Sequence, residues 1–298
     1  MNILKKNAKA IVSALLIGVM GLGLAGCGGG GTTTTTTAAP TTAATEPTTE
    51  AKEVLRVGLE CGYPPFNWTQ LDDSNGAVPI EGSEQFAGGY DVEIAKKLAE
   101  GLDRELIIVK TEWDGLIPAL TSGVIDVVIA GMSPTAERKE TIDFTDNYYK
   151  SDLVVVVKAG GKYENAAALK DFAGAKITAQ QNTFHYTVID QIEGVVKEQA
   201  MSDFPAMRVA LESGVIDGYI SERPEGVSAS AANKNFKMVT FPAGEGFVAS
   251  DDDVAIAAGV KKGNEEFISA MNEIINSISD EERTQIMDQA ILNQPAAE

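Results

Sequence analysis

The segment Ala-Leu-Thr-Ser-Gly-Val-Ile-Asp occupies residues 119–126, and Ala-Leu-Glu-Ser-Gly-Val-Ile-Asp occupies residues 210–217. The second copy follows 91 residues after the first, and Ile129 matches Ile220 three positions beyond each copy. Each copy has the pattern of a helix end, a glycine near the C-cap and then a strand rich in β-branched residues. A repeat of this kind predicts two similar α/β units that face each other across a site.

Polar residues follow each of the two predicted strands. The first strand, expected over residues 124–130, ends at Ala130 and leads into Gly131 and Ser133. The second strand leads into Glu222. These residues are therefore candidates for the lining of a site between the two units.

Apolar periodicity predicts alternating strands and helices. One helical face of apolar residues marks residues 91–102, and a continuous apolar run at 124–130 marks a strand covered on both faces. The other predicted elements are strands at 54–59, 106–109, 153–157, 176–179 and 254–260, a helix end at 169–172, and helices at 113–121, 201–212, 265–278 and 280–292. This alternation predicts an α/β fold in which mostly parallel sheets are flanked by helices.

The chain is long enough for two lobes of ordinary size. Its C-terminal stretch does not have the pattern of a separate lobe, so we expect it to complete the first one. The predicted first lobe comprises residues 54–155 and 250–298, and the second comprises residues 156–249. Two crossings between the lobes, near residues 154–158 and 249–256, would form a two-segment hinge.

Residues 1–26 have the pattern of a lipoprotein signal peptide. Three lysines precede an apolar run, which closes on Leu24-Ala25-Gly26-Cys27. Small residues before a cysteine are typical of the signal-peptidase site, so we expect cleavage before Cys27 and a palmitate-type lipid on it. A transmembrane anchor is the alternative, but the run is short of the roughly 20 apolar residues that a span needs.

Residues 27–53 have the composition of a disordered linker. Four glycines, six consecutive threonines and an Ala/Pro/Thr/Glu stretch cannot bury a core. Such a tether holds the folded part away from the bilayer. We therefore expect a lipid-anchored protein on the extracytoplasmic face of the cell membrane, and the length of the linker favours a Gram-positive envelope.

The chain is strongly acidic. It has 43 Asp and Glu against 24 Lys and Arg, a net charge of −19 that becomes −22 without residues 1–26. This balance disfavours nucleic acid and anionic lipid surfaces as partners. Apart from Cys27, Cys61 is the sole cysteine and His185 the sole histidine, so the sequence predicts no disulfide, no metal cluster and no cofactor. A Cys61–His185 dyad is conceivable, but two unrelated side chains are favoured.

The stretch Gly89-Tyr90-Asp91-Val92-Glu93-Ile94 resembles the signature of the extracellular solute-binding proteins of family 3, the polar amino-acid receptors of ABC importers. Further stretches resemble motifs of the same family: Tyr63-Pro64-Pro65-Phe66, Trp113-Asp114-Gly115-Leu116-Ile117-Pro118, Gly131-Met132-Ser133-Pro134-Thr135 with Glu137-Arg138, and Asp143-Phe144 with Tyr148-Tyr149. The resemblance spans residues 54–292. It implies a two-lobed type II periplasmic-binding-protein fold that closes over one amino acid.

A carboxylate site is expected after the first strand of the repeat. Ser133 followed by Pro134 is a strong helix start, with Ser133 as N-cap and Pro134 at N1, and a helix N-terminus attracts anions. Arg138 would lie about one and a half turns into this helix, where its planar fork suits a carboxylate. The resemblance implies that Arg138 binds the α-carboxylate of the ligand. From the residues alone, a surface arginine paired with Glu137 or Glu140 is the alternative.

The second lobe is expected to supply the acceptor for the α-ammonium. The resemblance places an acid at Glu222, and a carboxylate there would compensate the desolvated ammonium. An exposed loop acid is the alternative. Gln180 and Thr183 belong to a segment that resembles the second-lobe donor to the α-carboxylate, although the family more often has glycine at the place of Asn182. Phe184 is either a ligand contact or a core residue.

Selectivity is expected to depend on two aromatic residues and one acid. Tyr63, which shares an aromatic turn with Phe66, and Trp113 would sandwich the ligand side chain, because aromatic faces attract cations; core packing is the alternative for Trp113. By resemblance, Glu60 points toward the cleft, and in the family an acid there accompanies basic ligands but also glutamine. A buried carboxylate against an uncharged ligand carries a desolvation penalty. Lysine or arginine is therefore the favoured ligand, with glutamine and cystine as alternatives.

Together these features predict a non-catalytic substrate-binding lipoprotein of an ABC amino-acid importer. Its partners would be one free amino acid, a membrane permease that recognises the closed form, and the bilayer through Cys27, and we expect a monomer. An enzyme on the same fold is one alternative, against which the sequence offers no metal cluster and no convincing nucleophile–base pair. An extracellular sensory module is another, which usually requires a fused transmembrane and signalling region.

Overall fold

The computed structural model describes residues 52–295. The expected signal peptide, Cys27 and nearly all of the expected linker lie outside the described residues. No helix of this described part combines the length and the apolar character that a bilayer span requires.

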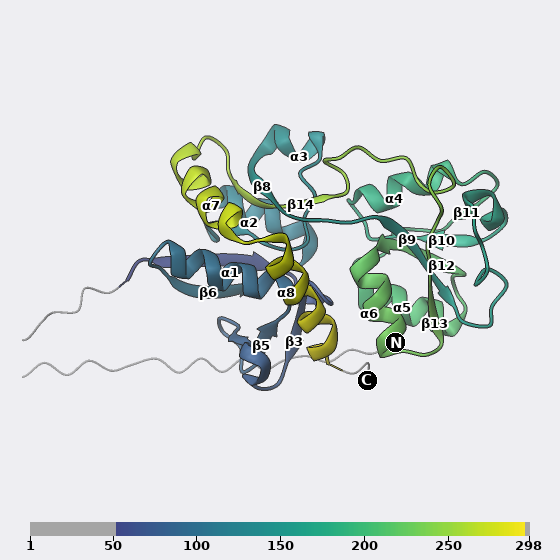
Figure 1. Ribbon diagram of the computed structural model, residues 1–298, viewed down its shortest axis with the longest axis horizontal. Coiled ribbons are helices and arrows are strands. Elements are labelled where there is room, and N and C mark those ends of the chain that lie inside the picture. Colours follow the sequence, from purple (N-terminus) through teal and green to yellow (C-terminus); the bar gives the residue numbers. More distant parts are fainter. Residues whose placement is uncertain (1–51, 296–298) are drawn as a thin grey trace, which may run out of the picture. The chain divides into compact units, whose positions relative to one another are not determined.

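The first lobe is built on a five-stranded sheet with the order β6-β1-β7-β14-β8 (Figure 1). Its strands are β6 (Glu105–Lys110), β1 (Val54–Leu59), β7 (Val127–Val128), β14 (Ala255–Lys261) and β8 (Ile142–Lys150). Its helices are α1 (Tyr90–Gly101), α2 (Leu116–Ser122), α3 (Ala136–Thr141), α7 (Glu265–Ser277) and α8 (Asp280–Asn293), with the 3-10 turn η2 (Trp113–Gly115) before α2. The helix α2 packs on β1 and β7, whereas α1 packs on β6 and α7.

The chain between β1 and α1 forms a small antiparallel sheet, which belongs to the first lobe. Its order is β2-β3-β5-β4, and the 3-10 turn η1 (Ser74–Gly76) precedes β4. Its strands are β2 (Gly62–Tyr63), β3 (Asn67–Gln70), β5 (Phe86–Gly88) and β4 (Val78–Pro79). This sheet holds the Tyr63 turn at the carboxyl end of β1.

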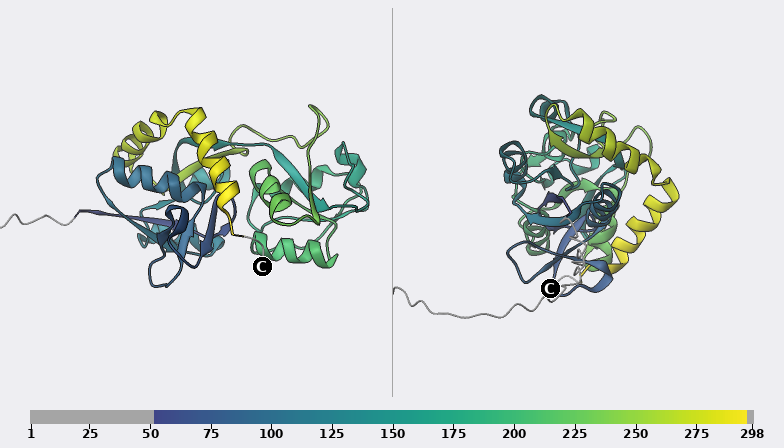
Figure 2. Two further views of the ribbon diagram at one scale, coloured as in Figure 1. Left: turned by 60° about the horizontal axis from the view of Figure 1, so that its bottom comes forward. Right: turned by 90° about the vertical axis from the view of Figure 1, so that its left-hand side faces the viewer.

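The second lobe is built on a second five-stranded sheet, with the order β11-β10-β12-β9-β13. Its strands are β11 (Val196–Lys197), β10 (Lys176–Thr178), β12 (Gly218–Glu222), β9 (Leu153–Lys158) and β13 (Phe236–Val239). Its helices are α4 (Phe184–Val188), α5 (Phe204–Ser213) and α6 (Arg223–Ala232), with the 3-10 turns η3 (Leu169–Phe172) and η4 (Ile189–Gln191). The helix α8 packs against α1 and also reaches α6 of this lobe (Figures 1 and 2).

Both sheets are mixed, but four of the five strands in each run in one direction, which agrees with the expectation of mostly parallel sheets. In the first sheet β1 runs parallel to β6 and β7, but β14 is antiparallel to β7 and β8. In the second sheet β10 runs parallel to β11 and β12, but β9 is antiparallel to β12 and β13. Helical crossovers keep the first three strands of each sheet parallel. The strands that carry the chain between the lobes enter in the opposite direction.

The chain leaves the first lobe earlier than the sequence predicted. The strand β9 pairs with β12 from Leu153 onward, so the crossing lies at Ser151 and Asp152 rather than near 154–158. The return crossing lies beside it, because the Ser151 N–H donates to the Val254 carbonyl over 3.0 Å. Two neighbouring segments therefore join the lobes.

The two copies of the repeat form the same turn. The helices α2 and α5 each end before a left-handed glycine, Gly123 with φ 81° and Gly214 with φ 78°. The strand expected over 124–130 is shorter, with ladder pairing only at β7, because residues 124–126 complete the turn. In the second copy the helix begins at Phe204, not at residue 201, because Asp203 caps it by accepting the N–H of Ala206 over 2.8 Å.

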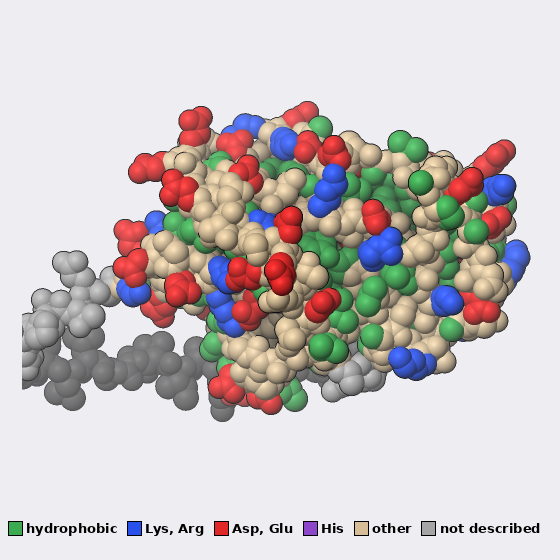
Figure 3. All heavy atoms as spheres, viewed as in Figure 1, with side chains coloured by type: hydrophobic (Ala, Val, Ile, Leu, Met, Phe, Trp, Pro, Cys, Tyr) green, Lys and Arg blue, Asp and Glu red, His purple; other side chains and the backbone are tan. Residues whose placement is uncertain are grey.

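The expected helix end at 169–172 is a single 3-10 turn. Acidic side chains gather over the helices of the first lobe on the face seen in Figure 3. Both α7 and α8 begin with acidic residues, which stabilise the positive N-terminal ends of their helix dipoles.

Candidate functional site

A small, partly open cavity lies between the two lobes. Its volume is about 10 Å³, the space of one water molecule. Its lining is Tyr63, Trp113, Gly131, Ser133, Arg138, Gln180, Thr183, Phe184, His185 and Glu222. The structure thus brings the predicted residues together at one place, except Glu60, Phe66 and Ala130, which do not line the cavity, and adds His185.

Arg138 stands on the short helix α3, which begins later than the sequence predicted. Thr135, not Ser133, is the N-cap, and its hydroxyl accepts the N–H of Arg138 over 3.4 Å. The Ser133 hydroxyl instead donates to the Asp253 carbonyl over 2.9 Å. This contact with the returning chain keeps Ser133 and Pro134 outside the helix, so Arg138 lies in its first turn.

The Arg138 side chain is half-buried and has no carboxylate partner among residues 52–295. It donates to the carbonyl of Ser133 over 2.8 Å and to the carbonyl of Asn182 over 3.0 Å, and it lies 5.0 Å from the ring centre of Trp113. Burial lowers its pKa to about 10. A desolvated cation held by carbonyls and an aromatic ring is a binding group for an anion.

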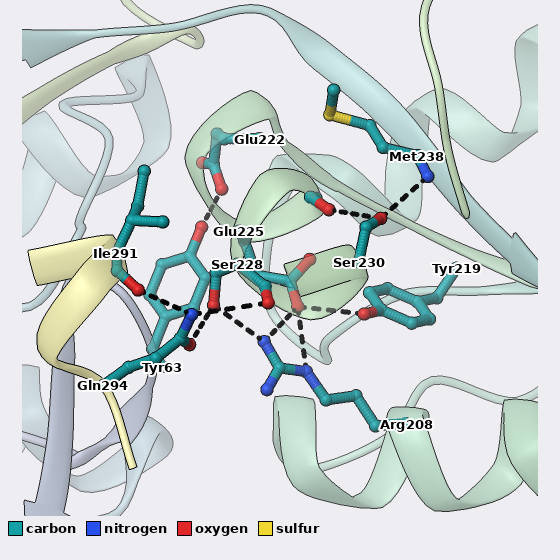
Figure 4. Close-up of polar contacts among 11 residues, drawn as sticks. Tyr63, Arg208, Tyr219, Glu222, Glu225, Ser228, Ser230, Met238, Ile291 and Gln294 are labelled. Atoms are coloured by element: carbon teal, nitrogen blue, oxygen red, sulfur yellow. Dashed lines mark hydrogen bonds and ion pairs between the residues drawn. The ribbon is translucent and has the colours of Figure 1, made fainter. Parts of the chain in front are cut away.

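Glu222 faces the same cavity from the second lobe. It ends β12, occupies the N-cap position of α6, and is 2% exposed. The hydroxyl of Tyr63, from the first lobe, donates to its carboxylate (Figure 4), and Nε2 of His185 lies 2.9 Å from Oε1. Burial raises the pKa of Glu222 to about 8. A cation placed beside this carboxylate would restore its ionised form.

His185 is the lining residue that sequence reasoning left outside the site. Burial lowers its pKa to about 3, so its imidazole is neutral at physiological pH. Its Nδ1 atom is buried and has no hydrogen-bond partner in the described part of the chain. The available signal was its place two residues after Thr183, on the short helix α4 that faces the first lobe.

Glu60 follows β1 and is 8% exposed. Its Oε2 accepts a hydrogen bond of 3.1 Å from the Gln180 amide, which also donates to the Ser202 carbonyl over 3.1 Å. Burial raises the pKa of Glu60 to about 8, and Oε1 is buried without a hydrogen-bond partner among the described residues. Glu60 is thus a second desolvated carboxyl between the lobes, with one oxygen available.

The expected aromatic sandwich is arranged differently. The Tyr63 ring stacks on Phe204 of α5, with a centroid distance of 4.1 Å and an interplanar angle of 12°, and the face of Trp113 is covered by Arg138. Phe66 is fully buried in the core, 4.9 Å from Tyr63 between ring centroids. Gly131, with φ 61°, leaves room for Tyr63, since a Cβ there would lie 2.7 Å from the ring.

A buried polar network supports the Gly131 segment from behind. The carboxylate of Asp91 accepts hydrogen bonds from the Asn67 amide over 2.9 Å and from the Tyr148 hydroxyl over 2.8 Å. That hydroxyl accepts the Gly131 N–H over 3.2 Å. Burial raises the pKa of Asp91 to about 6. The network fixes the turn that follows β7, where Ala130 is also fully buried.

Two further predicted residues lie on the second-lobe wall. The Thr183 hydroxyl donates to the Gln180 carbonyl over 2.7 Å, and the half-buried Phe184 begins α4.

Residues 52–295 contain no group of three or more His, Cys, Asp or Glu placed to hold a metal ion. Cys61 is buried, which raises the pKa of its thiol to about 12.

The family described as bacterial extracellular solute-binding proteins, family 3, matches residues 55–293. The L-cystine-binding protein TcyJ of Escherichia coli (strain K12) is 30% identical over 221 residues, which are 74% of this chain and 76% of that protein.

Solved structures share the two-lobed fold. An amino acid ABC transporter substrate-binding protein from Streptococcus pneumoniae, bound to L-arginine, is similar with a TM-score of 0.70 and 24% identity over 80% of this chain and 93% of that one. An ancestral arginine-binding protein is similar in its complex with arginine, with a TM-score of 0.64 and 30% identity over 80% and 98% of the chains. The complex of an ancestral arginine-binding protein with glutamine is also similar, with a TM-score of 0.65 and 28% identity over 80% of this chain and 97% of that one. The chain therefore has the two-lobed α/β architecture of these proteins.

Proposed function

Because this chain belongs to the bacterial extracellular solute-binding proteins of family 3, we propose that it is the amino-acid receptor of an ABC importer. The family consists of binding proteins, so the chain is not an enzyme. It would close its lobes, divided at the two neighbouring crossings, over one amino acid and present it to a membrane permease. The closed form is stabilised because the ligand contacts both lobes at once.

One observation carries this proposal: the two lobes contribute opposite charges to one cavity, and neither charge is paired with the other in an ion pair. Arg138 comes from the first lobe and Glu222 from the second. An α-amino acid carries a carboxylate for Arg138 and an ammonium for Glu222. Each desolvated charge would then gain a partner, which is the arrangement that makes a buried charge favourable.

Glu60 supports a basic side chain on the ligand. Glu60 does not line the cavity, but it accepts a hydrogen bond from Gln180, which does. Glu60 behind Gln180 and Glu222 in the lining would supply two carboxylates against the single guanidinium of Arg138, which suits a ligand with a net charge of +1. Arginine and lysine have that charge. The arginine complex of the ancestral relative, at 30% identity, agrees with this preference.

Glutamine is the second candidate, and a specific observation favours it. Burial raises the pKa of Glu60 to about 8, so a closed cleft without a cation holds this carboxyl protonated at neutral pH. A protonated carboxyl and the Gln180 amide together suit a neutral amide side chain. The ancestral arginine-binding relative has also been solved with glutamine. Cystine, the ligand named for the Escherichia coli relative, is a third possibility for this chain.

A thermal-shift panel of the twenty amino acids, with ornithine and cystine added, tests the proposal. We expect arginine or lysine to raise the melting temperature most, because a ligand that binds the native state stabilises it by an amount that grows with the logarithm of its concentration divided by its Kd. A shift with glutamine or cystine alone would contradict the preference assigned to Glu60. No shift with any compound would contradict the receptor proposal itself.

We also propose that the mature chain is a monomer tethered by lipid on Cys27 to the extracytoplasmic face of the membrane, in a Gram-positive envelope. The support is the sequence Leu24-Ala25-Gly26-Cys27 and the linker composition after it. Replacing Cys27 by alanine should move the protein from the membrane fraction to the medium or the soluble fraction. Unchanged membrane association, with no incorporation of a labelled fatty acid into the wild-type protein, would contradict the anchor.

A further inference from the structure

Asn182 has a left-handed backbone and directly precedes Thr183, which lines the cavity. Its φ is 55°, a conformation that costs most residues free energy and that asparagine tolerates better than other residues with a Cβ. The left-handed conformation therefore explains why either glycine or asparagine can occupy this position. It does not explain what the asparagine side chain adds.

The side chain of Asn182 reaches the opposite lobe. Its amide donates to Oδ1 of Asp114 over 2.8 Å, and the neighbouring Gln181 amide donates to Oδ2 over 2.6 Å. Asp114 belongs to η2 of the first lobe, whereas Gln181 and Asn182 follow β10 of the second. One carboxylate thus accepts hydrogen bonds from two adjacent residues across the cleft. We call these three residues the clasp.

The clasp is directly connected to the carboxylate site. The Asn182 carbonyl accepts a hydrogen bond of 3.0 Å from Arg138, and Trp113, the residue before Asp114, stacks on the same guanidinium. Asn182 therefore contacts the first lobe twice: its side chain donates to Asp114, and its backbone carbonyl accepts from Arg138. Neither Asp114 nor Asn182 lines the cavity.

We propose that Asn182, held by Asp114, is a positioning residue that closes the second lobe over the carboxylate site without touching the ligand. This inference rests on the proposed function, because it concerns the affinity of the same site. Contacts made only in the closed form favour closure, and closure raises the affinity for any ligand that needs it. The clasp should therefore act equally on all amino acids, whereas Glu60 should act on selectivity.

The central test is Asn182→Gly, which keeps a residue suited to the left-handed backbone and removes only the side chain. We expect L-arginine and L-glutamine each to bind about three- to tenfold more weakly, by the same factor, with faster dissociation, because exposed hydrogen bonds to a carboxylate make modest contributions. Calorimetry gives the affinities and stopped-flow fluorescence the dissociation rates.

Further variants separate a positioning role from a general loss of stability. Asp114→Ala combined with Asn182→Gly should weaken binding less than the product of the single effects, since both remove the same contact. The exchange Asp114→Asn with Asn182→Asp should restore part of the affinity, because one amide–carboxylate hydrogen bond can form again. Glu112→Ala, which removes an exposed acid two residues before Asp114, is the matched control and should bind as the wild type does.

Two outcomes would overturn the clasp. One is wild-type affinity for both ligands in Asn182→Gly and Asp114→Ala. The other is a loss of affinity for only one of the two ligands, which would mean that Asn182 contacts the ligand side chain. Should the wild type bind no amino acid, the proposed function fails, and small-angle scattering then decides the clasp by itself. A larger radius of gyration in ligand-free Asp114→Ala than in Glu112→Ala supports it, and an unchanged one overturns it.

Discussion

The two copies of the repeat form nearly identical turns and then lead to opposite chemistry. In each copy a left-handed glycine, Gly123 or Gly214, ends the helix. The aspartate that closes each copy accepts a backbone N–H of the neighbouring strand, over 2.8 Å at Asp126 and 2.9 Å at Asp217. Beyond the turn, the first lobe leads to a guanidinium and the second to a carboxylate.

The difference lies at the ends of the strands, while the similarity lies at their beginnings. The turns stand at the start of β7 and β12, where they set the direction of each strand. Ser133 and Arg138 follow β7 in one lobe, and Glu222 ends β12 in the other. These residues are free to differ because they do not hold the turn together. The same helix-to-strand turn thus occurs in two lobes that contribute complementary charges.

Arg138→Ala tests the charge that the first lobe contributes to the site. We expect a loss of at least about 100-fold in affinity for every amino acid that binds, because the ligand carboxylate would be buried without its partner. Isothermal calorimetry measures this, and Arg138→Lys is the control that keeps the charge but loses the planar fork. Wild-type affinity in Arg138→Ala would remove Arg138 from the site.

Glu222→Gln tests the charge that the second lobe contributes to the site. We expect about a 30- to 100-fold loss for arginine, because the α-ammonium would lose its counter-charge while an amide of similar shape remains. The matched ligand is 5-guanidinopentanoic acid, which is arginine without the α-amino group. Its affinity should be nearly the same in the wild type and in Glu222→Gln. An equal loss for both ligands would show that Glu222 does not recognise the ammonium.

Glu60 adds a dependence on pH that distinguishes the candidate ligands. Burial raises its pKa from 4.5 to about 8, so closure over a neutral side chain takes up about one proton at pH 7. That complex is most stable below pH 4.5 and loses stability as the pH rises through about 8. A cationic side chain keeps Glu60 ionised, so arginine binding should lack this proton uptake.

Calorimetry in buffers with different ionisation enthalpies measures the uptake directly. Glu60→Gln should weaken arginine binding about tenfold, leave glutamine binding within a few fold, and abolish the proton uptake with glutamine. Equal proton uptake with both ligands in the wild type would contradict the role of Glu60. The Glu222 carboxyl meets the same ammonium in both cases and serves as the internal reference.

The smallest effects on binding are expected from the shared turns. Gly123→Ala places a Cβ in open space and Gly214→Ala places one 3.8 Å from Nζ of Lys158, an ordinary contact, so the main cost in each is the left-handed conformation, about 1–2 kcal/mol of stability. Urea unfolding should show similar losses for the two variants. Ligand affinity should stay within about twofold, and a large loss of affinity from either variant would mean that the turns do more than hold the strands.

The parts of the fold that the sequence predicted are those set by local interactions. The repeat, the glycine C-caps and the apolar faces of α1, α7 and α8 depend on residues a few positions apart. The start of α3 was predicted wrongly because Ser133 and Thr135 are both good caps. The choice between them depends on Asp253, 120 residues away, whose carbonyl takes the Ser133 hydroxyl.

The predicted site residues gather around the cavity because they follow strand ends that meet there. The sequence did not indicate His185 as a lining residue or Asp114 as a clasp residue, because their partners lie in other segments: Glu222 for His185, and Gln181 and Asn182 for Asp114. Such contacts are decided by how two lobes meet, and no sequence periodicity records them. The mixed direction of the sheets has the same origin, because it depends on where the chain crosses between lobes.

The position of β14 determines when the first lobe can be completed. This strand lies between β7 and β8, yet it comes from residues 255–261, after the whole of the second lobe. During synthesis, β8 has no neighbour in its sheet until this late segment emerges. The second lobe has all five of its strands by residue 239, so it is the unit that can form first. The lobe nearer the N-terminus is therefore the last to be finished.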